Sequence, residues 1–222
     1  MIEEERVGAY IESLYRGNEG FLAELETKAG QERIPIIRPQ VQNLLRTVIT
    51  GLKPRSILEV GTAVGFSAIL MAQCAPADCR ITTIENYEKR IPAAEENFKR
   101  AGYSDRITLI KGDAADVLGE LRNKSAGSER FDLVFMDAAK GQYLNFFEDV
   151  MALLGEGGVL VSDNVLQEGD IIQSRFAVRR RDRTIHSRMR EYLYVLTHDE
   201  RLSTTILPMG DGVTVSVKKI KA

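Results

Sequence analysis

The amino-acid sequence predicts an α/β protein with a doubly wound, mostly parallel sheet that ends in an antiparallel C-terminal hairpin. Short apolar runs alternate with segments of helical periodicity from residue 56 to residue 162, as in a parallel sheet covered on both faces. The runs 203–208 and 213–219 are instead joined by a glycine-rich turn. The first apolar run leads into two glycines and a helix, which is typical of nucleotide-like ligand sites.

The individual elements follow in order along the chain. Two short helices are expected within residues 3–29, and a third opens at Arg38-Pro39 and runs to about Thr50. We expect a single domain over residues 1–222. The predicted strands are 56–60, 80–84, 107–110, 131–136 and 158–162, and the predicted helices that follow residue 60 are about 66–75, 88–102, 114–122 and 142–154.

Charge is unevenly distributed along the chain. The segment from Arg175 to Arg190 holds seven arginines and one acid, Asp182, which is a local charge of +6. Because the net charge of the chain is −2, the remainder carries −8. This asymmetry favours an anionic partner at one patch of the surface.

Cysteine use and hydropathy indicate where the protein works. Cys74 and Cys79 have no further cysteine or histidine nearby, so we expect packed thiols in a reducing compartment and no zinc site. The N-terminus has no leader pattern, and no uncharged run approaches the length of a membrane span. We therefore expect a cytoplasmic protein.

The turn after the first predicted strand indicates the kind of nucleotide ligand. Gly61 and Gly65 lie four residues apart, Ala63 stands between them, and the third glycine of a dinucleotide fingerprint is missing. Glu59 would repel a pyrophosphate but suits a cation. S-adenosylmethionine carries a sulfonium and an α-amino group, so the turn predicts a methyltransferase cofactor site. An antiparallel terminal hairpin on a parallel sheet is likewise the architecture of class I (Rossmann-like) methyltransferases.

Further cofactor ligands are expected at the ends of the next two strands. Glu85 follows the second strand, where an acid can accept both hydroxyls of a ribose. Gly112 and Asp113 follow the third strand and could flank an adenine. Taken alone, Glu85 is equally well explained as a solvated loop acid, and the signal at Gly112 and Asp113 is weak; the glycine turn is what favours the cofactor interpretation of Glu85.

Three oxygen ligands follow the fourth and fifth strands. Asp137, Asp163 and Asn164 come from adjacent loops at one rim of the sheet, and together they suit Mg²⁺, or Mn²⁺. Any one of them alone would more often be a helix or turn cap. Lys140 follows Asp137 by three residues, and we expect it to accept the proton of an attacking hydroxyl, although most lysines are simply surface residues.

These motifs together resemble those of the metal-dependent O-methyltransferases typified by catechol and caffeoyl-CoA O-methyltransferases. The resemblance rests on Leu-Glu-Val-Gly-Thr-x-x-Gly-Phe-Ser, Asp-Ala-x-Lys and Asp-Asn, and it covers about residues 30–220. It implies a homodimer, with residues 1–50 forming a cap or a dimer surface. It implies Asp137, Asp163 and Asn164 as metal ligands, Lys140 and Asp137 as catalytic residues, and Ile37, Glu59, Gly61, Thr62, Ser67, Glu85, Gly112, Asp113 and Asp137 as cofactor ligands.

The substrate is suggested by the basic segment and by a departure from the family pattern. Ala138 stands where small-molecule members often have an aromatic residue or histidine, which disfavours a flat phenolic substrate. The segment 176–190 and the later Leu-Pro-Met-Gly-Asp-Gly resemble bacterial tRNA 5-hydroxyuridine methyltransferases. This resemblance implies a tRNA anticodon loop as partner, bound by arginine forks that pair with phosphates. The expected RNA-binding residues are Arg175, Arg179, Arg180, Arg181 and Arg183.

Two alternatives to the tRNA substrate remain open. The arginines could form a solvated helical face, in which case the enzyme would methylate a small catechol-like diol and would tolerate their loss. A non-catalytic cofactor- or RNA-binding protein is disfavoured, because the three oxygen ligands and the basic residues are all present. We expect His186 to be a structural or phosphate-contacting residue, since the metal site already has three oxygen donors.

Overall fold

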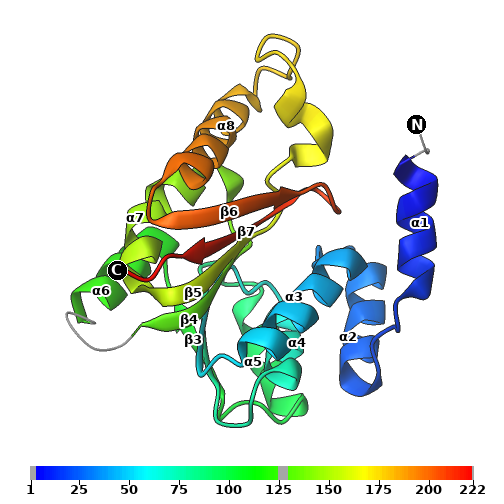
Figure 1. Cartoon of the computed structure of the whole chain (residues 1–222). Coiled ribbons are helices and arrows are strands. Elements are labelled where there is room, and N and C mark those ends of the chain that lie inside the picture. The colour runs from blue at the N-terminus through cyan, green and yellow to red at the C-terminus, as the bar shows by residue number, and fades with distance from the viewer. Residues whose placement is uncertain (1–3, 125–129, 222) are drawn as a thin grey trace.

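A seven-stranded sheet runs through the centre of the computed structural model, which describes residues 4–124 and 130–221 (Figure 1). The strand order is β3-β2-β1-β4-β5-β7-β6, and the five strands from β1 to β5 are parallel. β7 runs antiparallel to both β5 and β6, which confirms the predicted terminal hairpin. The strands are β1 (Ser56–Val60), β2 (Arg80–Glu85), β3 (Ile107–Lys111), β4 (Phe131–Met136), β5 (Leu154–Ser162), β6 (Leu202–Leu207) and β7 (Val213–Lys218).

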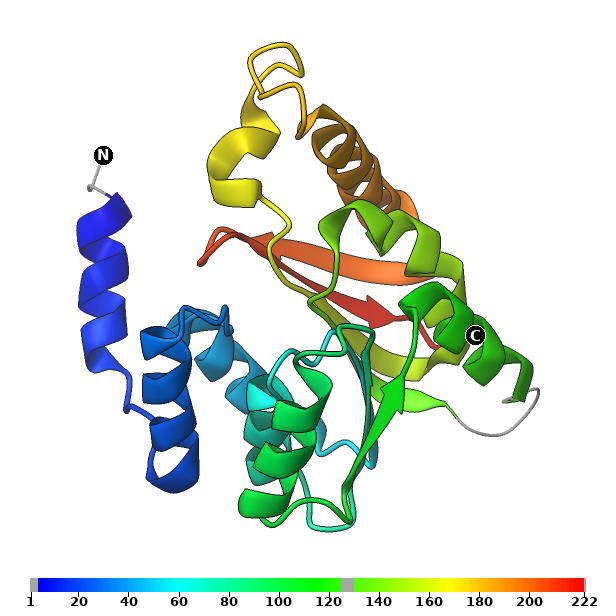
Figure 2. The same cartoon turned by 180° about the vertical axis from the view of Figure 1, so that it is seen from behind.

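Helices cover both faces of the sheet, as the alternation of elements predicted (Figures 1 and 2). One face carries α2 (Gly20–Gln31), α3 (Pro39–Leu52), α4 (Phe66–Cys74) and α5 (Ile91–Arg100), with α1 (Glu4–Leu14) at the outer edge beyond α2. The other face carries α6 (Ala114–Lys124), α7 (Tyr143–Leu153) and α8 (Arg183–His198). Two short 3₁₀ helices, η1 (Lys140–Gln142) and η2 (Gln167–Ile172), precede α7 and α8.

Each helical layer packs on its own hydrophobic cluster. Leu22 of α2 and Leu45 of α3 are fully buried in the same cluster as Ile69 of α4. The helices α2 and α3 are therefore part of the main helical layer, and a cap or dimer surface at residues 1–50 stays a prediction. On the opposite face, Tyr143 and Tyr192 meet edge to face with ring centroids 5.5 Å apart and join α7 to α8.

The chain differs from the sequence prediction in two elements. β5 begins at Leu154, four residues early, because Leu154 pairs with Phe131 before an irregularity in the register. The helix α8 was not predicted at all. Its buried side chains, among them Met189, Tyr192 and Leu196, do follow a helical period, but the arginines around them obscured it.

The parallel strands place their carboxyl ends along one edge of the sheet. β1 lies between β2 and β4, so the chain reverses its direction of winding beside β1. In open α/β sheets, ligands bind at this switch point. None of the described helices combines the length and apolarity needed to cross a membrane.

Candidate active site

The turn after β1 can be made only by glycine at its first position. Gly61 has φ of +101°, and a Cβ atom on it would collide with the carbonyl group of Asp137 at the end of β4. Two backbone bonds hold the neighbouring strand ends in register: Gly61 N donates to Ile84 O (3.1 Å), and Asp137 N donates to Val60 O (3.0 Å). The backbones of three strands thus meet closely where the ligand cavity opens.

A cavity of about 260 Å³ lies at this switch point. Seven of the nine predicted cofactor ligands line it: Ile37, Gly61, Thr62, Ser67, Glu85, Asp113 and Asp137. Pro35 and Ile36 complete the border formed by the segment before α3. Glu59 and Gly112 are not among the lining residues.

Glu85 is held in place at the wall of this cavity by backbone N–H groups. Its Oε2 accepts a hydrogen bond from Ala63 N (2.7 Å), and its Oε1 accepts from Asn86 N (3.0 Å) and Tyr87 N (2.9 Å). Oε1 already accepts two bonds, and Oε2 can accept one more. The side chain is therefore preorganised to accept a hydroxyl of a ribose, which is compatible with its predicted role.

Glu59 lies behind the cavity wall instead of facing the ligand. It is fully buried, its Oε2 accepts from Thr83 Oγ1 (2.5 Å), and its Oε1 has no partner within the described residues. Burial raises the pKa of Glu59 to about 7, while the hydroxyls of Ser67 and Thr83 act in the opposite direction. A direct contact with a cofactor cation does not follow from this placement; Glu59 can influence the cavity only through neighbours such as Ser67.

A second cavity, of about 300 Å³, adjoins the first and contains the three predicted metal ligands. Asp137, Asp163 and Asn164 line it together with Asp211 from the turn between β6 and β7. The two cavities share Asp137 and five other lining residues: Pro35, Ile36, Ile37, Ala63 and Arg90. The carboxylate of Asp137 therefore stands at the boundary between the cofactor cavity and the metal cavity.

The three oxygen donors are in mutual contact. Asn164 Nδ2 donates to Asp137 Oδ1 (2.8 Å), and Asp163 Oδ1 accepts from the backbone N of Asn164 (2.7 Å). Asn164 has φ of +62°, a conformation that asparagine tolerates better than most residues. The hydroxyl of Tyr143 donates toward the carbonyl oxygens of Met136 and Asp163 (3.1 Å each) and so ties the ends of β4 and β5 together.

The carboxylates of Asp137 and Asp163 repel each other, and a bound cation would stabilise their ionised forms. Burial, followed by the repulsion of Asp137, raises the pKa of Asp163 to about 7, and burial also raises the pKa of Asp137. Within the described residues no three His, Cys, Asp or Glu side chains gather to hold a metal, and the third oxygen donor beside the two carboxylates is the amide of Asn164. Rotation of that amide presents its oxygen, and two carboxylates with one amide oxygen fit Mg²⁺ or Mn²⁺.

Lys140 lies close to both acids without lining either cavity. It begins η1, and its positive charge partly opposes the rise that burial causes in the pKa values of Asp137 and Asp163. Its ammonium group is therefore near enough to interact with the metal site. The role of Lys140 as a base stays a prediction.

The basic segment divides into structural and exposed arginines. Arg183 donates to the carbonyl oxygens of Val178 (3.2 Å) and Phe176 (3.1 Å) and so closes the loop before α8, and its role in RNA binding stays a prediction. Arg188 and Arg190 likewise donate to backbone carbonyls. The exposed members of the predicted set are Arg175, Arg179, Arg180 and Arg181, the last of which pairs with Asp182 at 3.5 Å.

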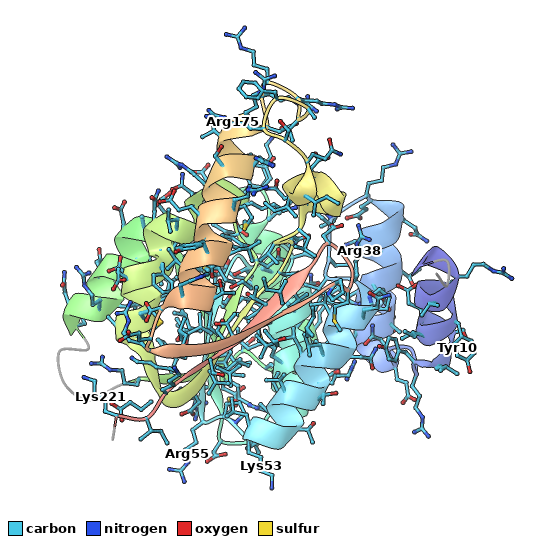
Figure 3. The ribbon with its side chains drawn as sticks, turned by 45° about the horizontal axis from the view of Figure 1, so that its top comes forward. Tyr10, Arg38, Lys53, Arg55, Arg175 and Lys221 are labelled. Atoms are coloured by element: carbon cyan, nitrogen blue, oxygen red, sulfur yellow. The ribbon has the colours of Figure 1, made fainter. Side chains whose placement is uncertain are left out.

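His186 is buried, which agrees with the structural role that was one of the two roles predicted for it. Its exposed fraction is 2%, and its Nε2 lies 3.2 Å from the carbonyl oxygen of Gln173. Figure 3 shows Arg175 at the outer end of the loop before α8, away from Arg38 at the turn of the terminal hairpin. The exposed arginines thus form a projection of the surface and do not line the cavities.

Sequence reasoning missed three charged residues that line the second cavity. Asp211 was interpreted only as part of a turn, Arg38 only as the start of a helix, and Arg90 not at all. Local sequence carries no signal for these residues, because Arg38 and Asp211 are 173 positions apart and meet only in the folded chain.

The strand order, the terminal hairpin and the cavity at the switch point define a class I methyltransferase fold. The structure superimposes with a TM-score of 0.86 on a putative caffeoyl-CoA O-methyltransferase from Staphylococcus aureus, at 27% identity and covering 96% of this chain and 99% of that one. An O-methyltransferase from Bacillus cereus, solved in complex with SAH (S-adenosylhomocysteine), gives a TM-score of 0.83 at 28% identity, with coverage of 96% and 97%.

The chain belongs to the O-methyltransferase family, whose model matches residues 13–219. Among its relatives is a catechol O-methyltransferase of Mycobacterium tuberculosis, 33% identical over 75% of this chain and 74% of that protein. A catechol O-methyltransferase of Niastella koreensis is 31% identical over 76% of each chain. The predicted resemblance to the catechol and caffeoyl-CoA enzymes is therefore confirmed.

Proposed function

We propose that this protein is a divalent-metal-dependent O-methyltransferase that moves a methyl group from S-adenosylmethionine to the hydroxyl of 5-hydroxyuridine at the wobble position of tRNA. The main observation in support of this proposal is that Asp137 lines both the cofactor cavity and the cavity with three oxygen donors. Such a boundary can bring a methyl donor and a substrate oxygen into contact. The S-adenosylhomocysteine in the related Bacillus cereus structure supports this choice of cofactor.

Metal dependence is supported by the chemistry of the donor set. Asp137, Asp163 and Asn164 would hold Mg²⁺, which when bound would orient two adjacent substrate oxygens and acidify the hydroxyl. Around it, the protein has to hold the substrate in line with the methyl donor and exclude water. Pro35, Ile36 and Ile37 suit that purpose, because they border both cavities with largely apolar side chains.

Lys140 is the group that we assign to proton removal. Its charge interacts with both acidic ligands, and it is half-buried at the start of η1. When the substrate hydroxyl loses its proton to the Nζ atom of the uncharged amine, the oxygen can attack the methyl carbon, the bond from that carbon to the sulfonium sulfur breaks, and S-adenosylhomocysteine leaves. The proton then leaves to solvent through the exposed side of the lysine.

The tRNA substrate is supported by the exposed arginines of the loop that follows the metal ligands. Arg175, Arg179 and Arg180 project into solvent between Asn164 and α8. Guanidinium groups bind phosphates in bidentate fashion, and an unpaired wobble base can be turned into a pocket at low cost. The 5-hydroxyl and the 4-carbonyl of 5-hydroxyuridine supply the two adjacent oxygens that a metal site requires. We also propose that the protein is cytoplasmic and forms a homodimer.

A small catechol-like diol is the second candidate substrate. Two relatives at 31% and 33% identity are named catechol O-methyltransferases, and a catechol also has two adjacent oxygens. Ala138 lines the cofactor cavity beside Asp137 and gives neither a catechol ring nor a 5-hydroxyuracil ring an aromatic surface to stack on, so the exposed arginines are what favours tRNA.

One experiment distinguishes the two substrates. Labelled S-adenosylmethionine and Mg²⁺ are supplied with bulk tRNA from a strain that lacks this gene, and in parallel with catechol. We expect label in tRNA, located at a wobble uridine after nuclease digestion. Label in catechol alone would instead assign the enzyme to small molecules.

A further inference from the structure

Arg90 is the lining residue that stands at the border of both cavities and has no assigned role. It is half-buried at the start of α5, and its Cζ lies 5.4 Å from the centre of the Tyr87 ring. No carboxylate in the described part of the chain forms an ion pair with it, whereas Arg100 on the same helix pairs with Glu24. Arg90 thus presents a fixed, uncompensated positive charge to the cavities.

The charge balance of the second cavity leaves this cation in surplus once a divalent cation is bound there. Its walls carry three carboxylates, those of Asp137, Asp163 and Asp211, and two guanidinium groups, those of Arg38 and Arg90. Arg38 is paired with Asp211 at 2.8 Å. A divalent cation would balance the other two carboxylates, which leaves one net positive charge at Arg90. Lys140 lies close by and adds to the surplus.

We propose that Arg90 binds a phosphate group of the nucleotide that is methylated. This inference rests on the proposed function, since it takes the substrate to be a nucleotide. A 5-hydroxyuridine carries its reactive oxygens on the base and its phosphates on the sugar. When the base oxygens reach Asp137, Asp163 and Asn164, the phosphates lie at other walls of the two cavities, and Arg90 is a cationic lining residue that both cavities share. A free catechol has no anionic group to place there.

The test compares 5-hydroxyuridine with its 3′,5′-bisphosphate, which offers a phosphate on either side of the sugar. Binding of each to the full-length protein with Mg²⁺ and S-adenosylhomocysteine is measured by calorimetry. The wild type should bind the bisphosphate at least about tenfold more tightly, the difference expected of a charge-assisted hydrogen bond. Arg90→Ala should lose that preference. Arg100→Ala, on the same helix but outside both cavities, should keep it.

Three results would overturn the proposal. In the first, Arg90→Ala keeps the preference for the bisphosphate. In the second, the wild type shows no preference or binds neither compound. In the third, Arg90→Ala weakens S-adenosylhomocysteine instead, which would assign the guanidinium to the cofactor carboxylate. Methylation of a synthetic anticodon stem–loop by the wild type is measured separately, so a wrong tRNA assignment is distinguished from a wrong role for Arg90.

Discussion

Arg38 and Asp211 form an ion pair with a nitrogen–oxygen distance of 2.8 Å, and this pair joins the segment before α3 to the turn of the terminal hairpin. Gly210 N also donates to Gln40 Oε1 (2.7 Å), so the two segments are joined twice. The segment before α3 borders both cavities, and Asp211 raises the pKa of Asp163. One surface contact therefore fixes two walls of the site.

We predict that Arg38→Ala affects activity more than stability. The Arg38 side chain is about half-exposed, and such ion pairs contribute roughly 0–1 kcal/mol to the free energy of unfolding. Methyl transfer should fall by about tenfold or more, because the walls of the cavity loosen and Asp211 is left unpaired beside Asp163. Denaturant unfolding and kcat/KM are measured on the same protein. If Asp211→Asn added a full, independent loss to that of Arg38→Ala, the pair would not act as a unit.

Removal of a metal ligand should abolish turnover while leaving the cofactor cavity able to bind. Asp163→Asn keeps the shape of the side chain but removes one of two buried charges, so Mn²⁺ affinity measured by calorimetry should fall by at least tenfold. Asp137→Ala should abolish methyl transfer. Asp170→Asn, on η2 outside both cavities, serves as the control. Full activity of the wild type after treatment with a chelator would contradict metal dependence.

The double variant Arg180→Ala/Arg181→Ala should weaken binding of tRNA and reduce its dependence on salt. Loss of two phosphate contacts should lower the slope of log K against log salt by roughly one to two. Arg55→Ala is a matched control, because Figure 3 shows Arg55 at the opposite end of the molecule from Arg175. An unchanged slope in the double variant would show that these arginines are merely solvated.

The buried acid Glu59 should make the ligand-free protein less stable as the pH rises. Its folded pKa of about 7 lies above the ordinary value of 4.5, so the folded state keeps a proton that the unfolded state has lost. Stability should fall between about pH 4.5 and 7 and then level off, by up to roughly 3 kcal/mol. Glu59→Gln should reduce this slope in denaturant titrations at pH 5 and 8, and the part that remains belongs to Asp163 and Asp137, whose pKa values burial also raises. The exposed Glu96→Gln should retain the full slope.

Gly61→Ala should damage the fold and the site together. A Cβ atom there meets the backbone of Asp137, and φ of +101° is itself unfavourable for alanine by about 1–2 kcal/mol. We expect reduced stability and loss of S-adenosylhomocysteine binding, both of which thermal shift with and without the ligand can measure. Gly51→Ala in α3 has open space around it and should instead be neutral or slightly stabilising. Normal ligand binding by Gly61→Ala would refute the close approach of the strands.

Local sequence patterns predicted the sheet and most of the cofactor cavity, because both depend on strand ends. The glycine turn and the acids after β2, β3, β4 and β5 are readable for this reason. Residues brought in by long-range packing, such as Arg38, Arg90 and Asp211, have no such signal. Glu59 was assigned to the ligand because its position in the motif suggested contact, whereas burial is decided by how β1 packs between its neighbours.

Five arginines of the arginine-rich segment were predicted together as RNA-binding residues, yet the arginines of this segment make different contacts in the folded chain. Arg183 donates hydrogen bonds to the carbonyl oxygens of Phe176 and Val178, and Arg188 donates one to the carbonyl oxygen of Gly141. Charge alone does not distinguish a guanidinium that closes a loop from one that faces solvent. The distinction arises from α8, whose apolar face orients the start of that helix.

Asp137 belongs to the walls of both cavities, and this sharing has a thermodynamic consequence. Under the proposed function, a cation in one cavity changes the charge that the other cavity presents, so the affinities for the metal ion and for the sulfonium cofactor depend on each other. That dependence is reciprocal: the factor by which the metal ion changes the affinity for the cofactor equals the factor by which the cofactor changes the affinity for the metal ion. The cell's supply of one ligand would then set how readily the enzyme takes up the other.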